Sequence, residues 1–189
     1  MRPLSIFAAA CRRSFGIRIA LRARVIYLAV ILILSFGFLQ SQSAVITWDG
    51  GGGDEFWHTI ANWSGDTLPS AQDDVLITAL DTQITITNSV EVRAFSIASG
   101  GSVTVQGSGV SFQATGNTAI DGASLIVRNG ARLTLPTLTQ YDETRNKTFG
   151  VVFESSGAGS VLDLSNATRL SDSTAQLTGI AIRALGGGL

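Results

Sequence analysis

The residues best suited to chemistry lie between Thr47 and Asp66, in the stretch TWDGGGGDEFWHTIANWSGD. This stretch contains all three tryptophans of the chain and its only histidine. His58 lies close to Asp54 and Asp66 in sequence, so a carboxylate could orient it as a general base. No nucleophile motif of the form G-x-S-x-G occurs in the chain, and a histidine among aromatic residues is more often packed than catalytic. We therefore predict no catalytic residue.

The glycine run Gly50–Gly53 raises the question of a bound ion. Asp49, Asp54 and Glu55 surround it, and their oxygens could hold calcium. Their spacing matches neither the EF-hand loop nor the aspartate-glycine nonapeptide repeat, which favours a solvated turn. A phosphate-binding loop is not expected, because no Gly-Lys-Ser/Thr follows the glycines. We expect no cofactor, with calcium as the one alternative that these carboxylates leave open.

Trp48, Trp57 and Trp63 allow two opposite interpretations. Exposed indole rings stack on the apolar face of a sugar, so the three could form a carbohydrate-binding platform. Buried indoles would instead cover an exposed end of the fold. The choice depends on the elements that position these residues.

Residues 1–43 have the composition of an export leader. Six arginines and no acidic residue precede Val25–Leu39, an uncharged and mostly apolar run of fifteen residues. Small residues follow this run, and we predict cleavage between Ser43 and Ala44. The run is shorter than the roughly twenty residues of a stable membrane helix. The alternative is an uncleaved anchor that crosses the inner membrane through residues 25–39, with the arginines inside.

Beyond the leader the chain is acidic and contains no cysteine. All fourteen acidic residues but only seven of the thirteen basic ones follow residue 44, which gives a net charge of −7. Nucleic acid is not expected as a partner, because its phosphates require a basic surface. Disulfides and thiolate metal sites are excluded for this part of the chain. Its length suits a single domain.

From Val75 onward apolar residues alternate with Thr and Ser in short segments separated by glycine and asparagine. This pattern predicts an all-β fold. Residues 95–105 align without a gap on 125–135, an offset of 30, and Leu162 follows Leu133 by 29 in a further copy. Repeated units of strand, turn and strand bury their apolar faces by stacking. We therefore predict a right-handed parallel β-helix, with an antiparallel sandwich as the competing fold.

The segment 61–77, ANWSGDTLPSAQDDVLI, resembles the start of secreted bacterial β-helix proteins, where W-D-G-G-G, N-W-S and D-D-V-x-I precede the first rungs. It is similar also to the start of the eight-glycine extracellular domain family. The later strands resemble autotransporter-passenger and pectin-lyase-like solenoids. Gln72 departs from the resemblance, because a small residue is usual at its position. The resemblance implies a β-helix at the bacterial surface and no particular activity.

A β-helix needs a cover over the apolar end of its first rung. Residues 44–80 are expected to supply this aromatic cap and to lead into the rungs, with Asp73 and Asp74 accepting hydrogen bonds from turn amides. The rungs are expected to fill 81–189. No aromatic cluster or amphipathic helix follows them, so either the last rung stacks against a partner or a second copy, or the chain is the leading piece of a longer product, which we favour.

The sequence thus favours an exported, non-catalytic structural or adhesin-like module, secreted or held in the cell envelope. The alternative is a carbohydrate-binding or polysaccharide-cleaving β-helix. Asp142, Glu143, Arg145 and Lys147 form the densest mixed-charge cluster, although a solvated loop is the favoured interpretation. The expected partners are an extracellular polysaccharide or another surface protein, and the membrane if the leader is retained.

Overall fold

The computed structural model describes residues 43–189 except 99, 145–149 and 175–178. The described residues belong to one compact unit, Gln42–Leu189. This unit holds the whole described hydrophobic core. The predicted leader and its apolar run 25–39 lie outside the described residues. Within the described ranges no helix has the length and apolar character needed to cross a bilayer.

The described part of the chain is built from short strands, as the alternating pattern predicted. They are β1 Val45–Thr47, β2 Asp74–Ile77, β3 Gln83–Ile86, β4 Val90–Val92, β5 Ala94–Ile97, β6 Ser102–Gln106, β7 Ser111–Ala114, β8 Thr118–Ile120, β9 Ser124–Arg128, β10 Arg132–Thr134, β11 Gln140–Glu143, β12 Val151–Ser156, β13 Val161–Asp163, β14 Arg169–Asp172 and β15 Ile180–Leu185. Two single-turn 3-10 helices, η1 Ile60–Asn62 and η2 Ser64–Asp66, lie between β1 and β2.

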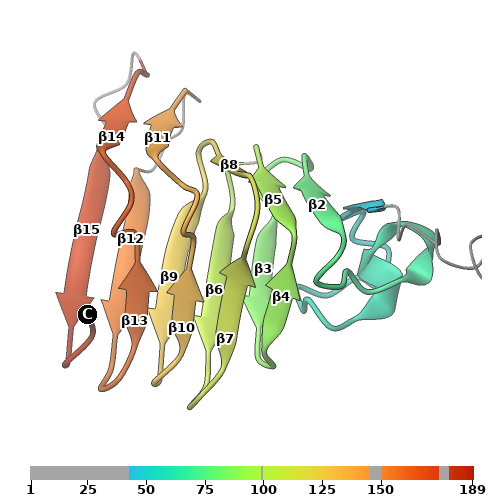
Figure 1. Cartoon of the computed structure of the whole chain (residues 1–189), viewed down its shortest axis with the longest axis horizontal. Coiled ribbons are helices and arrows are strands. Elements are labelled where there is room, and N and C mark those ends of the chain that lie inside the picture. Colours follow the sequence, from blue (N-terminus) through green and yellow to red (C-terminus); the bar gives the residue numbers. More distant parts are fainter. Residues whose placement is uncertain (1–42, 99, 145–149, 175–178) are drawn as a thin grey trace, which may run out of the picture. The chain divides into compact units, whose positions relative to one another are not determined.

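The strands pair in parallel and stack into three faces. One face consists of β1, β2, β5 and β8, the second of β3, β6, β9, β12 and β15, and the third of β4, β7, β10 and β13. A further pair, β11 and β14, follows β8, and Figure 1 shows the strands succeeding one another along the stack. From β2 to β10 each turn of the chain therefore lays one strand on each face, and β11 and β14 take the place of a first-face strand in the later turns. This arrangement is consistent with a parallel β-helix and differs from the antiparallel pairing that a sandwich requires.

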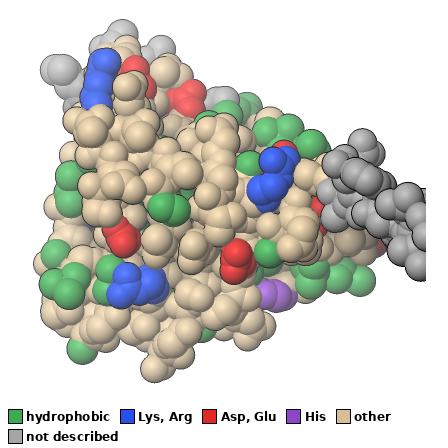
Figure 2. Space-filling model, in the orientation of Figure 1, with side chains coloured by type: hydrophobic (Ala, Val, Ile, Leu, Met, Phe, Trp, Pro, Cys, Tyr) green, Lys and Arg blue, Asp and Glu red, His purple; other side chains and the backbone are tan. Residues whose placement is uncertain are grey.

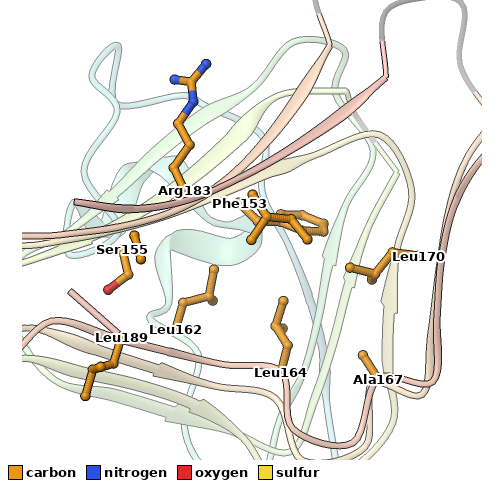
Figure 3. Close-up of a pocket in the computed structure, with 10 residues that line it drawn as sticks. Phe153, Ser155, Leu162, Leu164, Ala167, Leu170, Arg183 and Leu189 are labelled. Carbon is orange, nitrogen blue, oxygen red and sulfur yellow. The ribbon is translucent and has the colours of Figure 1, made fainter.

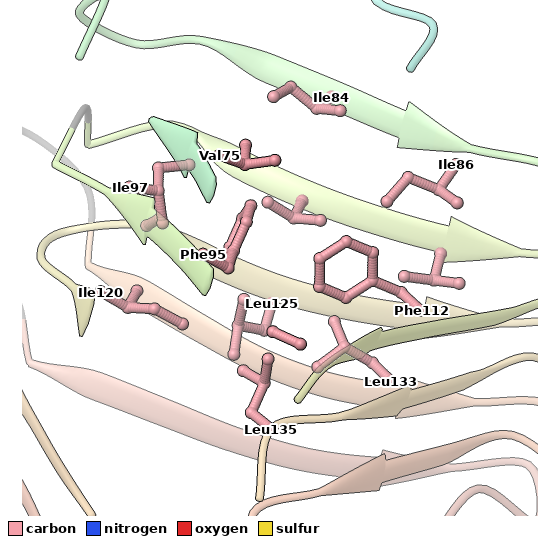
Figure 4. Packing of buried hydrophobic residues seen from close by; sticks show 14 of the residues in the cluster. Val75, Ile84, Ile86, Phe95, Ile97, Phe112, Ile120, Leu125, Leu133 and Leu135 are labelled. Carbon is pink, nitrogen blue, oxygen red and sulfur yellow. The ribbon is translucent and has the colours of Figure 1, made fainter. Parts of the chain in front are cut away.

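Side chains of equal depth form columns through the interior. On the second face Ile84 pairs with Val103, Val103 with Leu125, Leu125 with Phe153, and Phe153 with Ile182. Because side chains alternate along a strand, every second residue of each rung joins such a column. Figure 4 shows Ile84 and Leu125 of this column in the same core as Phe112 of the third face. Burial of each enclosed side chain of this column, Ile84 to Phe153, stabilises the fold by roughly 1.5–3 kcal/mol.

The 30-residue offset found by alignment is not the spacing of paired residues in the stack, although the repeat itself exists. Phe95 pairs with Thr118 rather than with Leu125, and Val103 pairs with Leu125 rather than with Leu133. The aligned segments are β5–β6 and β9–β10, which occupy different pairs of faces. They resemble each other because each is two alternating strands joined by a corner glycine at positive φ.

The later spacing was predicted correctly. Leu133 pairs with Leu162, 29 residues further along. The rungs lengthen along the chain: Ile84 is 19 residues from its partner Val103, whereas Leu125 is 28 from Phe153. Most of the extra residues lie between the strands, because the strands of the second face lengthen only from four residues in β3 to six in β12 and β15.

Candidate functional site

The three tryptophans lie inside the fold at the beginning of the stack. Trp48, Trp57 and Trp63 are 5 %, 1 % and 0 % exposed. The ring centroid of Trp63 is 4.9 Å from that of Trp48 and 4.5 Å from that of Trp57, both in edge-to-face geometry. Trp57 continues this cluster to Phe112 at 5.5 Å. The indoles cover the interior of the first rungs, and none of them presents an exposed ring face on which a sugar could stack.

Trp63 is also tied to the cap by a hydrogen bond. Its Nε1 donates to the carbonyl oxygen of Trp57 at 2.7 Å. Both partners are buried, so each polar group would be left without a partner if the other were removed. The indole of Trp63 therefore stabilises the cap both by packing on the other two rings and by its hydrogen bond to the Trp57 carbonyl oxygen.

Asn62, which the sequence did not single out, organises the glycine run. It is fully buried. Its Nδ2 donates to Oδ1 of Asp54 at 2.8 Å and to the carbonyl oxygen of Phe56 at 3.1 Å, and its Oδ1 accepts from the amide of Gly52 at 3.0 Å. Gly52 has no room for a side chain there, since an added Cβ would lie 2.8 Å from Oδ1 of Asn62. The asparagine immediately before Trp63 was the available signal.

The carboxylates predicted for calcium are engaged in turns. Oδ1 of Asp49 accepts from the Gly51 amide at 3.0 Å, and Oδ1 of Asp54 accepts from the Phe56 amide at 2.9 Å. The Phe56 amide is also the first cause of the lowered pKa of Asp54. Glu55 is exposed. Across the described ranges no three metal-binding side chains come together, so calcium at these residues has no geometric support and stays a prediction.

His58 does not form the base–orienter pair that its neighbours in sequence suggested. Its ring is half-buried, and Nδ1 is enclosed without a hydrogen-bond partner. Burial lowers the pKa of this imidazole, so the neutral form predominates at pH 7. Oδ2 of Asp54 accepts from Thr59 at 2.8 Å instead of orienting the histidine.

The predicted cleavage residues lie at the start of β1. The amide of Ala44 donates to Oδ1 of Asp73 at 3.3 Å, and its carbonyl oxygen accepts from the Asp74 amide at 2.8 Å. Arg93 donates to Oγ of Ser43 at 2.5 Å. Asp73 also accepts from the Ser70 amide, as predicted for a carboxylate in this turn. The Ser43–Ala44 peptide, at which cleavage is predicted, is thus built into the first rung.

The last rung presents an apolar hollow of about 350 Å³ (Figure 3). Phe153 and Ser155 of β12 form one wall, and Ile182 of β15 and Leu189 line it as well. Ile182 is 70 % and Leu189 79 % exposed, so the interior columns are uncovered at this end of the described chain. The buried hydroxyl of Ser155 has no hydrogen-bond partner.

The mixed-charge cluster predicted around Asp142 and Glu143 is split by the strand that carries it. Arg145 and Lys147 lie outside the described residues. Asp142 accepts hydrogen bonds from Ser171 and Ser173 of the next rung. Glu143 is buried, and the Tyr141 hydroxyl donates to its Oε2 at 3.3 Å. Neighbouring residues of a strand point to opposite sides, so these two carboxyls cannot act as a pair.

The face of the molecule drawn in Figure 2 carries few charges. Figure 2 shows isolated acidic and basic side chains among uncharged polar ones, with no continuous basic area on this face. On the second face Glu154 lies between two arginines, 3.3 Å from Nη2 of Arg128 and 3.8 Å from Nη1 of Arg183. Pairing across successive rungs orders these side chains along the stack.

Comparison with known proteins identifies no relative. No protein-family model, curated protein or solved structure matches the chain. The stacked parallel sheets rest on the strand pairing alone, and the resemblance of 61–77 to secreted β-helix proteins stays a prediction.

Proposed function

We propose that the chain is an exported, non-catalytic structural or adhesin-like module of the bacterial cell surface. The proposed fold is a right-handed β-helix, the hand that parallel crossover connections almost always take. The resemblance of the N-W-S and D-D-V-x-I segments to secreted β-helix proteins supports a place in the cell envelope or outside it.

The burial of Trp48, Trp57 and Trp63 carries the proposal. These residues were the best candidates for a ligand, and they close the interior of the first rungs instead. The aromatic residues therefore stabilise the stack itself. A rigid stack of this kind is suited to holding other parts of a surface protein apart, or to presenting its outer face to a partner. The partner is proposed to be another surface protein or an extracellular polysaccharide held without catalysis.

Export and ligand binding are tested separately. The full chain is expressed in a bacterial host, and cell fractions are assayed for the protein, which should leave the cytoplasm. The purified product is then titrated with soluble polysaccharides while tryptophan emission and acrylamide quenching are recorded. Buried indoles give blue-shifted emission that is poorly quenched and that no glycan alters. A glycan that shifts or protects this emission would favour the carbohydrate-binding alternative instead.

A further inference from the structure

The backbone nitrogen at the predicted cleavage site lies beside a carboxylate. The amide nitrogen of Ala44 lies 3.3 Å from Oδ1 of Asp73, a residue 29 positions further along the chain. Ala44 itself is exposed, and Val45 pairs with Asp74 in the parallel ladder of β1 and β2. The nitrogen that would become a free amine on cleavage after Ser43 therefore already has an acidic neighbour.

Asp73 has spare capacity for a cation. Its Oδ2 accepts from Oγ of Ser70 at 2.6 Å and from the Ser70 amide at 2.9 Å, and Oδ1 accepts from Ala44. All of these donors are neutral. The nearby Arg93 is directed instead to Asp74, with which it forms an ion pair. The hydrogen bonds, that from the Ser70 hydroxyl first, lower the pKa of Asp73 and keep it ionised at neutral pH.

We propose that the carboxylate of Asp73 is the binding site for the α-ammonium group that cleavage after Ser43 creates on Ala44. The inference rests on the export proposed above. In the cleavage, water adds across the Ser43–Ala44 amide and the carbon–nitrogen bond breaks. Ser43 leaves with a carboxylate, and the nitrogen of Ala44 takes up protons to become an ammonium group.

The exchange strengthens a contact that is already in place. A neutral amide donor becomes a charged one with three protons, and hydrogen bonds between ionised partners are shorter and stronger than neutral ones. The stronger interaction holds Ala44, the first residue of the processed domain, against the turn before β2. Removal of the leader thus adds an interaction to the first rung, close to the cap.

The position of the cut matters. Cleavage one residue earlier would leave the ammonium group on Ser43, whose side chain contacts the Arg93 guanidinium. Cleavage after Ser43 instead puts the ammonium group on the Ala44 nitrogen, which already lies beside the Asp73 carboxylate, and so joins opposite charges. The arrangement therefore favours Ala44 as the first residue of the processed chain.

The test uses the full chain, exported and processed by a bacterial host. Intact mass identifies the first residue of the product. The pH dependence of amine labelling then gives the titration of the α-amine, with Lys147, the only lysine, as an internal reference. Asp73→Asn removes the proposed partner. Asp163→Asn is the matched control, because Asp163 accepts from the Ser165 amide in a similar turn at the other end of the stack.

We expect a product that begins at Ala44 and an α-amine that titrates at least about half a pH unit above its ordinary range of 7.7–8.0. Asp73→Asn should abolish this upward shift, and Asp163→Asn should retain it. Equal titration in the Asp73→Asn product and the parent would overturn the inference, as would a product that begins elsewhere. An exported chain that keeps its leader overturns the inference alone, whereas a chain that stays in the cytoplasm refutes the proposed function.

Discussion

Replacement of Trp63 by alanine tests the cap most directly. The side chain is fully buried, packs edge-to-face on Trp48 and Trp57, and donates a hydrogen bond to the Trp57 carbonyl oxygen. Truncation of a buried tryptophan costs about 3–5 kcal/mol. Domains of this kind are stable by only about 5–15 kcal/mol in total. Trp63→Ala should therefore lower the unfolding midpoint substantially and can unfold the first rungs altogether.

A second variant separates the hydrogen bond from the packing. Trp63→Phe keeps an aromatic ring but leaves the buried Trp57 carbonyl oxygen without its donor, which costs about 1–3 kcal/mol. Phe56→Ala is the matched control, because this ring belongs to the same segment and is 48 % exposed. Its loss should cost about 1 kcal/mol, half or less of a full burial.

The assay is urea unfolding of each processed protein, followed by circular dichroism and by the remaining tryptophan emission. The expected order of destabilisation is Trp63→Ala, then Trp63→Phe, then Phe56→Ala. A loss below about 1 kcal/mol for Trp63→Ala would refute the reasoning, because it lies well under the cost of about 3–5 kcal/mol for truncating an enclosed tryptophan. That outcome would favour the alternative in which the tryptophans bind a ligand.

Three further predictions follow from the same contacts. In the column of the second face, Leu125→Ala should cost about 2–5 kcal/mol by urea unfolding and Ile182→Ala less than about 1 kcal/mol, because the first is enclosed and the second exposed; equal losses would contradict the stacking order. Asn62→Ala should lower the thermal midpoint and expose the Gly52 amide to hydrogen exchange, whereas retained protection would contradict its role. Because burial lowers the pKa of His58, its stabilising effect is present above the unfolded value of 6.5 and is lost as the pH falls through the folded value; His58→Gln should remove this part of the pH profile, and an unchanged profile between pH 7 and 5 would refute it.

The strands could be predicted from the sequence because alternation is local. A segment such as Val103-Thr104-Val105 specifies its buried and exposed sides without reference to any other residue. The pairing of rungs could not be predicted in the same way. All three faces use the same alternation, and the corners at Gly100 and Gly130 share a backbone conformation. An alignment of residues 95–105 with 125–135 therefore finds similar units that lie on different faces.

The candidate site shows the same division. The composition of residues 47–66 indicated an aromatic cap or a sugar platform, and nothing in the order of the residues distinguishes the two. The burial of the indole rings favours the cap over the sugar platform. This burial depends on residues distant in sequence, such as Phe112 of the second rung, which packs on Trp57. Asn62 was missed for a related reason, since its hydrogen bonds form only once the glycine run has folded back on it.

The sequence by itself determined an acidic, cysteine-free β domain that follows a basic and then apolar N-terminal segment, because charge, cysteine content and period-two alternation are properties of the chain alone. Only the tertiary structure decided which rungs are neighbours, which carboxylates meet a partner and which aromatic rings are covered. Asp142 and Glu143 are adjacent in sequence, yet their side chains point to opposite sides of a strand. Ala44 and Asp73 are 29 residues apart in sequence, yet they are in contact. The lengths of the corners decide which residues of different rungs meet, because they set the number of residues in each turn of the chain.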